Sequence, residues 1–270
     1  MKKRRTSAHR LLIPVVVLIS LLLLAATPVV AFVQAPATLL DRIVARGYIL
    51  AGTCGDYKPF TYLNPDTKEF SGIDIDMANE LGKALGVETR FVKTTWPTLM
   101  NDFHEGKFDI GMGGISVNLG RQKTGFFSIP YLTDGKTPIT LKENADKFQT
   151  LEQIDQPGVR VIVNPGGTNE RFARAHIKKA EIIVYNDNVT IFDQIVQGKA
   201  DLMITDAVET LLQQKLHPQL AAVHPDKPFT YSEKGYLMPR DFVLKAFVDQ
   251  WLHLTLMDGT FQKIYDNWLK

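Results

Sequence analysis

Short apolar runs rich in β-branched residues alternate with stretches of helical periodicity along most of the chain. The runs 48–53 and 159–163 are typical of buried strands, whereas 74–85 repeats apolar residues every four positions and ends at Gly86. Repeated strand–helix units of this kind predict parallel sheets with helices on their faces. We therefore expect an α/β fold. In its last part, the spacing of Val243, Phe247, Trp251 and Leu254 predicts the buried stripe of a C-terminal helix.

A glycine turn between a strand and a helix is the strongest local signal of a binding site. The strand that ends at Val163 is followed by Asn-Pro-Gly-Gly, which prevents any regular continuation, and then by Thr168 as the expected N-cap. Free amides at a helix N-terminus can hold a carboxylate. An ordinary strand-to-helix connection is the alternative that this turn alone leaves open.

The N-terminus has the pattern of a secretory signal peptide. Four basic residues, Lys2 to Arg5, precede an uncharged apolar run from Leu11 to about Val33. We expect residues 1–35 to direct export to the periplasm and then to be removed, with no membrane contact afterwards. Because the run is long for a signal peptide, an uncleaved membrane anchor is the alternative.

Export changes the charge of the chain. The full sequence has 31 basic and 29 acidic residues, but residues 1–31 contain five basic residues and no acidic one, which leaves 26 against 29. A mildly acidic mature chain gives no reason to expect a nucleic-acid partner. Cys54 is the only cysteine, so no intramolecular disulfide can form, and the six histidines lack the spacing of a metal site. We predict no metal. Whether copies of the chain associate is left open.

Ligands of open α/β sheets bind outside the carboxyl ends of the strands. The loops expected there supply one arginine, carboxylates, hydroxyls and the aromatic side chains Tyr57 and Trp96. This set suits a small, partly hydrophobic acid.

Several motifs resemble those of periplasmic solute-binding protein family 3, which includes the binding proteins for polar amino acids. They are Gly55–Phe60 (GDYKPF), Gly72–Met77 (GIDIDM), Gly114–Tyr131 (GISVNLGRQKTGFFSIPY), Gly166–Thr168 (GGT) and Asp201–Asp206 (DLMITD). The resemblance implies a type 2 periplasmic-binding-protein fold with a ligand cleft between two lobes, each a mostly parallel sheet flanked by helices. It places residues 36–134 and 228–270 in lobe 1 and residues 135–227 in lobe 2, with hinge crossings near 134–136 and 228–234. In that family the residues that match Arg121 and Thr168 hold the ligand carboxylate, and the one that matches Asp206 faces its ammonium.

Longer runs resemble the exported cyclohexadienyl dehydratases, which share this fold. They are Thr94–Phe103, Asp134–Thr140, Phe148–Gly158 and Val163–Glu170. The resemblance implies a carbon–oxygen lyase that converts prephenate to phenylpyruvate or arogenate to phenylalanine. Aromatisation drives this reaction, so we expect no cofactor. Gly120 departs from the transport proteins, which commonly carry a charged residue before the arginine.

The resemblance also implies the roles of the site residues. Glu170, in the first turn after the glycine turn, is the predicted general acid, although a helix N-terminus favours its ionised form. A solute-binding subunit of an importer for polar amino acids or related acids is the alternative function. The residues predicted to bind substrate are Tyr57, Trp96, Ser116, Arg121, Gly167, Thr168, Asn169 and Asp206.

Overall fold

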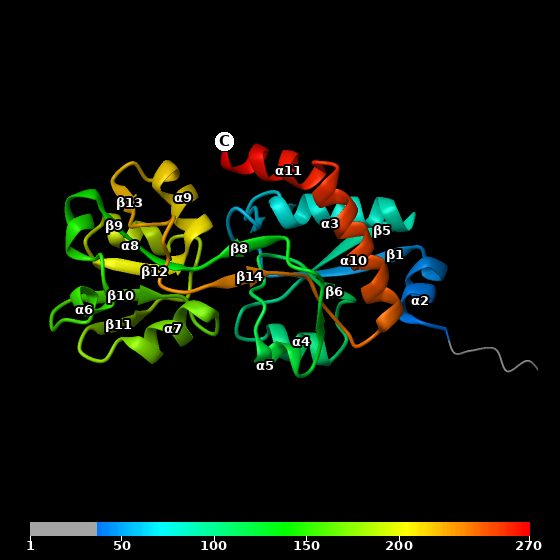
Figure 1. Ribbon diagram of the computed structural model, residues 1–270, viewed down its shortest axis with the longest axis horizontal. Coiled ribbons are helices and arrows are strands. Elements are labelled where there is room, and N and C mark those ends of the chain that lie inside the picture. The colour runs from blue at the N-terminus through cyan, green and yellow to red at the C-terminus, as the bar shows by residue number, and fades with distance from the viewer. Residues whose placement is uncertain (1–36) are drawn as a thin grey trace, which may run out of the picture. The chain divides into compact units, whose positions relative to one another are not determined.

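The strands of residues 37–270, the part of the chain that a computed structural model describes, form two five-stranded sheets with helices around each (Figure 1). This mixed α/β architecture with two sheet-bearing lobes confirms the predicted fold class. The predicted signal peptide, residues 1–35, lies outside the described residues. The division of the chain into lobes at residues 134 and 228 stays a prediction.

The first sheet has the strand order β5-β1-β6-β15-β7. Within it, β1 pairs in parallel with β5 and β6, while β15 runs antiparallel to β6 and β7. Its strands are β1 (Tyr48–Thr53), β5 (Glu88–Lys93), β6 (Ile110–Gly111), β7 (Phe126–Phe127) and β15 (Leu237–Met238). The helices of this lobe are α2 (Leu39–Arg46), α3 (Ile73–Leu85), α4 (Leu99–His104), α5 (Leu119–Gln122), α10 (Phe242–Met257) and α11 (Thr260–Leu269).

The second sheet has the order β11-β10-β12-β9-β13, with β10 parallel to β11 and β12, and β9 antiparallel to β12 and β13. Its strands are β9 (Lys136–Leu141), β10 (Arg160–Val163), β11 (Glu181–Val184), β12 (Leu202–Asp206) and β13 (Leu220–Ala222). The helices are η1 (Lys142–Lys147), α6 (Leu151–Ile154), α7 (Thr168–His176), α8 (Ile191–Val196) and α9 (Ala207–Leu216).

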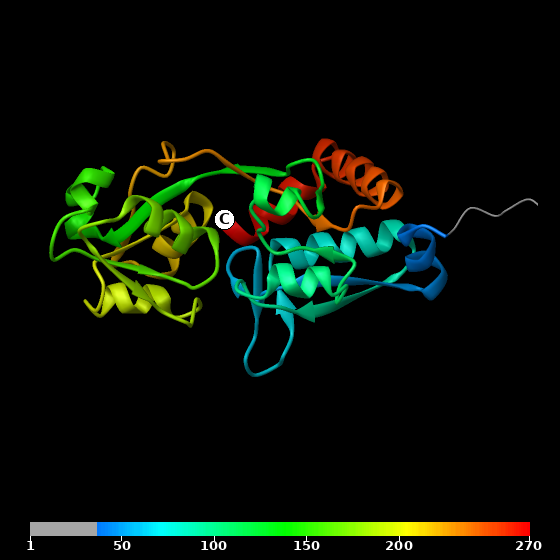
Figure 2. The same ribbon diagram turned by 90° about the horizontal axis from the view of Figure 1, so that it is seen from below.

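Two further strands connect the sheets. β8 (Leu132–Asp134) and β14 (Ser232–Lys234) form an antiparallel pair, and they run side by side in both ribbon views (Figures 1 and 2). In each sheet one strand runs opposite to the others, and it directly follows a crossing strand: β9 follows β8, and β15 follows β14. The sheets are thus less parallel than predicted, because each crossing segment adds a strand of the opposite direction. A small three-stranded sheet contains β2 (Asp56–Tyr57), β3 (Thr61–Leu63) and β4 (Phe70–Ser71).

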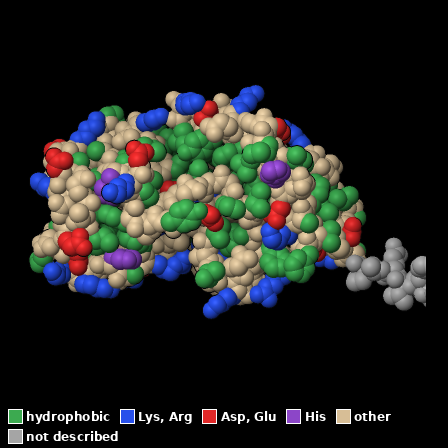
Figure 3. Space-filling view, viewed as in Figure 1, with side chains coloured by type: hydrophobic (Ala, Val, Ile, Leu, Met, Phe, Trp, Pro, Cys, Tyr) green, Lys and Arg blue, Asp and Glu red, His purple; other side chains and the backbone are tan. Residues whose placement is uncertain are grey.

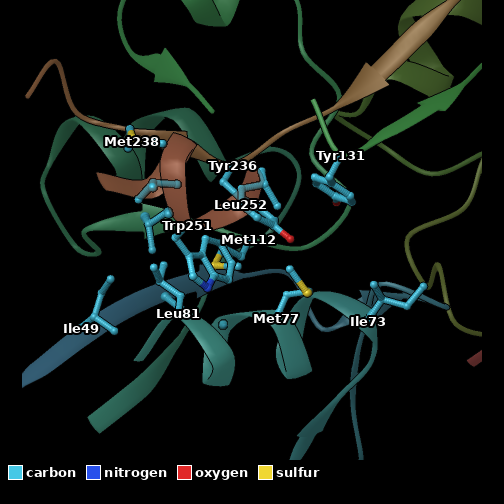
Figure 4. Close-up of a cluster of buried hydrophobic side chains, with 14 of the residues drawn as sticks. Ile49, Ile73, Met77, Leu81, Met112, Tyr131, Tyr236, Met238, Trp251 and Leu252 are labelled. Atoms are coloured by element: carbon cyan, nitrogen blue, oxygen red, sulfur yellow. The ribbon is translucent and has the colours of Figure 1, made fainter. Parts of the chain in front are cut away.

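The core of the first lobe lies between its sheet and the helices α3 and α10 (Figure 4). Leu244, Val248 and Leu252 of α10 are fully buried, whereas Val243 and Leu254 are 46% and 55% exposed. The predicted stripe of this helix is therefore confirmed only in part: Trp251 is buried and Phe247 packs against the core, but the most deeply buried residues repeat at i, i+4 and i+8 from Leu244.

The second sheet is covered on both faces. Val161 and Val163 of β10 pack with α7 residues on one face, and Ile162 packs with Phe192 and Ile195 of α8 on the other. Alternate side chains of a strand point to opposite faces, so a strand between two helical layers requires a continuous apolar run.

The surface offers no patch of one charge on the face drawn in Figure 3, where basic and acidic side chains are interspersed. Within residues 37–270, no helix is both long and apolar enough to cross a membrane.

Candidate active site

A pocket between loops of the two lobes contains every residue predicted to bind substrate. It encloses about 300 Å³ of space not filled by atoms. Most of its walls come from loops that follow strands of the two sheets, as expected for ligands of α/β folds. The lining residues are Tyr57, Trp96, Gly114, Ser116, Arg121, Asn164, Gly167, Thr168, Asn169, Asn188 and Asp206. Glu170 is not among them.

Arg121 provides a buried positive charge in this pocket. Asn118 is the N-cap of α5 and accepts a hydrogen bond from the Arg121 amide, which fixes the start of this short helix. The guanidinium Nη1 donates to the Ser116 carbonyl at 2.8 Å, and the residue is only 6% exposed. Burial, and then the nearby charge of Arg171, lowers the pKa of Arg121 to about 10. Arg121 therefore remains charged at neutral pH and is suited to bind a carboxylate.

Asp74 holds the loop that carries Ser116 through a hydrogen bond with the Gly114 amide. This carboxylate, at the start of α3, accepts hydrogen bonds from the Gly114 amide at 2.5 Å and from the Tyr131 hydroxyl at 2.7 Å. Burial raises the pKa of Asp74 to about 6. Asp74 thus positions a wall of the pocket without lining it.

Tyr57 and Trp96 form the aromatic wall. Their rings meet edge to face with centroids 5.7 Å apart, and Trp96 Nε1 donates to Asp56 Oδ1 at 3.0 Å. Both aromatic side chains line the pocket, where they can pack on an apolar ring.

Asp206 is held by two buried lysines. Lys136 Nζ donates to Oδ1 at 2.7 Å, while Lys234 Nζ and the Tyr57 hydroxyl donate to Oδ2 at 2.6 Å and 2.5 Å. Burial alone would raise the pKa of Asp206, but the charges of Lys136 and Lys234 outweigh it and hold this pKa well below its usual range. Asp206 is therefore ionised and already paired.

This pairing bears on the role that the resemblance implies for Asp206, which stays a prediction. Two lysines already balance the carboxylate, so an ammonium group would have to share it with them. Three cations, Arg121, Lys136 and Lys234, lie in or beside the pocket with Asp206. The other buried acids beside these lysines are Asp134, 3.9 Å from Lys234, and Glu209, and burial raises the pKa of both. The buried guanidinium of Arg121 suits an anionic ligand.

We expect Asp206→Asn to destabilise the protein by about 3–5 kcal/mol, because it leaves two buried lysines without their counter-charge. Urea unfolding at pH 7 measures this, with the exposed Asp187→Asn as the control. A loss below about 1 kcal/mol would contradict the pairing.

The glycine turn differs from the prediction in its cap. Gly167 is the N-cap, and Thr168 is the first residue of α7. The Thr168 hydroxyl accepts a hydrogen bond from Lys136 Nζ at 2.9 Å instead of capping the helix. Lys136 also donates to Asn169 Oδ1, so one lysine ties the turn to Asp206.

Glu170 points away from the pocket towards the turn and the helix surface. Its Oε2 accepts from the Gly166 amide at 2.7 Å, and its Oε1 pairs with Arg174 at 2.8 Å. The hydrogen bond from Gly166, and next that from Arg174, lowers the pKa of Glu170. These contacts favour the ionised form, which is the opposite of what a proton donor needs. A catalytic role for Glu170 stays a prediction that its surroundings do not support.

Glu209 is an acid that the sequence did not single out. It lies one turn of α9 beyond Asp206, is 1% exposed, and accepts a hydrogen bond from Thr205. Asn169, which lines the pocket, donates to the same Thr205 hydroxyl at 2.9 Å. Burial raises the pKa of Glu209 to about 8, and its hydrogen bond with Thr205 only partly opposes this effect. This shift favours the protonated form at neutral pH, although Glu209, like Glu170, does not line the pocket.

The lobes touch on both sides of the pocket. Asn188 Nδ2 donates to the Asp56 carbonyl at 2.9 Å. On the other side, a side chain at Gly166 would meet the backbone of Pro97 at 2.7 Å, so only glycine allows this approach. These contacts close the pocket and reduce the access of water.

Lys136, Lys234 and Glu209 were not predicted from the sequence as parts of the site. Both lysines lie at the predicted hinge crossings, and a charged residue at such a crossing was the available signal. Residues 37–270 contain no group of three or more His, Cys, Asp or Glu side chains placed to hold a metal ion.

Comparison with known proteins identifies the class that this fold and site define. Residues 49–270 match the model of the bacterial extracellular solute-binding proteins, family 3, and the chain belongs to this family. The curated cyclohexadienyl dehydratase of Pseudomonas aeruginosa is 56% identical over 240 residues, which cover 89% of each chain. The L-cystine-binding protein TcyJ of Escherichia coli K12 is 27% identical and covers 85% of each chain.

Solved structures agree with this placement. An ancestral cyclohexadienyl dehydratase has 56% identity and a TM-score of 0.56, and the match covers 87% of this chain and 98% of the ancestral one. An ancestral amino acid-binding protein, described as a precursor of cyclohexadienyl dehydratase, has 38% identity and a TM-score of 0.79, with 86% and 99% covered.

Proposed function

We propose that this protein is an exported cyclohexadienyl dehydratase, a carbon–oxygen lyase that acts in the periplasm on prephenate, arogenate or both. The observation that carries the proposal is the pocket, which brings the buried guanidinium of Arg121 and the N-terminus of α7 together with the aromatic wall of Tyr57 and Trp96. Glu209, a buried acid whose pKa is raised to about 8, lies next to this pocket without lining it. A protein that only binds and releases a solute has no need of a proton donor. The dehydratase of P. aeruginosa, at 56% identity, supports the same function.

The reaction needs two carboxylates held and one hydroxyl protonated. In prephenate the bond between the ring and its carboxylate breaks, carbon dioxide leaves, and the electron pair of that bond enters the ring. The ring hydroxyl leaves on the opposite side as water after it receives a proton. The product is phenylpyruvate, and arogenate gives phenylalanine in the same way.

The residues divide these tasks. Arg121 binds one carboxylate, and Thr168 with the free amides at the start of α7 binds the other. Tyr57 and Trp96 pack on the ring. Glu209 is the proposed source of the proton; it is linked to the pocket through Thr205, whose hydroxyl also accepts from Asn169, and after proton transfer it is a carboxylate that water reprotonates.

The paired state of Asp206 argues against the alternative of an importer subunit for amino acids. A ligand with an α-ammonium group gains nothing from a carboxylate that two lysines already neutralise. Prephenate has a keto group at that position and needs no anion there.

The direct test is turnover of each substrate by the purified mature protein at pH 7.5, with a sample without enzyme as the control. We expect phenylpyruvate from prephenate, followed by its absorbance in alkali, and phenylalanine from arogenate, followed by chromatography. Absence of both products, together with tight binding of a polar amino acid in calorimetry, would instead establish a solute-binding protein.

A further inference from the structure

A second hollow lies next to the pocket, outside the contact of Gly166 with Pro97. We call it the arginine groove; it is open and contains about 990 Å³ of unfilled space. Trp96 and Arg121 line both the pocket and the groove, so the groove leads directly to the buried guanidinium. The helices α5 and α7, on which its two arginines lie, are on the same side of the molecule in Figure 1. Its lining residues include Trp96, Pro97, Asn118, Gly120, Arg121 and Arg171.

The two positive charges of this groove have no acidic partner among the described residues that line it. No aspartate or glutamate lines it, and among the ion pairs of residues 37–270 none involves Arg121 or Arg171. Arg174, three positions after Arg171 on the same helix, pairs with Glu170 instead. The two groove arginines are close enough that Arg171 helps to lower the pKa of Arg121. Like charges brought together without an acid favour an anion between them.

Asn118 adds an amide donor at the wall of the arginine groove. Asn118 lines the groove, and its Nδ2 is buried without a hydrogen-bond partner among the described residues. A buried donor left unpaired is costly, so a ligand oxygen at this place would be stabilised.

Gly120 keeps the groove free of a side chain. It is exposed and has no positive φ, and a Cβ there would meet only Asn118 Oδ1, at 3.1 Å. The backbone therefore does not require glycine at this position, and a longer side chain would extend towards the groove or solvent.

We propose that the arginine groove is the path by which the anionic substrate reaches the pocket, and that Arg171 is its capture residue. Arg171 attracts a carboxylate at the mouth and passes it to Arg121 as the lobes close. The inference rests on the proposed function, since it takes the substrate to be a dicarboxylate, and it adds a residue that acts before chemistry.

The first test compares Arg171→Gln with Lys178→Gln, which removes an equal charge from an exposed residue just after α7 that does not line the groove. At about 20 mM ionic strength we expect kcat/KM for prephenate to fall about 3- to 10-fold in Arg171→Gln and to stay within about 2-fold in the control. In both variants kcat should stay near the wild-type value. At about 0.5 M salt the loss should disappear, because exposed charges are then screened.

The second test adds charge instead of removing it. Gly120→Glu places a carboxylate at the groove and should lower kcat/KM at low salt by a similar factor, whereas Gly120→Gln has the same size and should have little effect. Equal losses in the two Gly120 variants would show a steric effect and overturn the inference, as would a loss in Arg171→Gln that persists at high salt.

The outcomes separate this inference from the proposed function. If the wild type converts prephenate and Arg171→Gln behaves like Lys178→Gln, the capture role is refuted and the enzyme remains. If the wild type converts neither substrate, the proposed function fails, and the same four variants are compared by equilibrium binding of prephenate at low and high salt. Equal affinities in all of them would then refute the capture role too.

Discussion

Replacement of Glu209 by glutamine is expected to lower kcat for prephenate about 100-fold or more, with little change in KM. Glutamine keeps the size of the side chain and its hydrogen bond with Thr205, but it has no acidic proton to give. Glu170→Gln is the matched comparison, because the two glutamates are the competing proton donors. We expect it to lower kcat only a few-fold, through a looser glycine turn. A large loss in Glu170→Gln with normal turnover in Glu209→Gln would reverse the assignment.

The stability of the Glu209 variant gives a readout that does not depend on activity. The ordinary pKa of the glutamate is 4.5, whereas in the folded protein it is about 8. Between these pH values the folded state holds a proton that the unfolded state has released, so this residue makes the wild type less stable as pH rises. Relative to wild type, Glu209→Gln should gain stability from about pH 5 to about pH 8, by an amount on the order of a few kcal/mol. A difference that stays constant over this range in urea unfolding would show that Glu209 does not titrate there.

Replacement of Arg121 by methionine is expected to raise KM for prephenate about 100-fold or more, since the substrate carboxylate loses its charged, buried partner. Arg121→Lys keeps the charge but not the paired donors of the guanidinium, so its KM should fall between those of the wild type and the methionine variant. Thermal unfolding checks that both variants fold. Unchanged KM and kcat in the methionine variant would remove Arg121 from the binding site.

The sequence predicted the parallel centres of both sheets because buried strands and amphipathic helices have distinct periodicities. It did not predict the shortest strands, since runs such as Phe126–Phe127 and Leu237–Met238 carry too few residues to show a period. The buried face of α10 was predicted only in part, because the helix is apolar on more than one side: Trp251 is buried as expected, whereas Leu244 and Leu252 are buried in place of Val243 and Leu254.

The residues that line the pocket could be predicted because loops at strand ends converge in this fold. The charge state of the site could not, because it depends on contacts between distant positions. Lys136 and Lys234 are 98 positions apart, yet both donate to Asp206. Likewise, the raised pKa of Glu209 comes first from burial, which a short sequence motif does not report.

The pairing of β8 with β14 has a consequence for how such a site can arise. Asp134 and Ser232 are partners in that pair, so the second sheet and its helices form one uninterrupted insertion whose two ends are neighbours. A segment of this kind can be exchanged between relatives as a unit with only two junctions. The insertion carries Glu209 and Asp206, whereas Arg121 belongs to the surrounding chain. A recombination event at these junctions would therefore separate the proposed proton donor, together with Thr168, from Arg121, and chimaeras with an amino-acid-binding relative would inherit one part without the other.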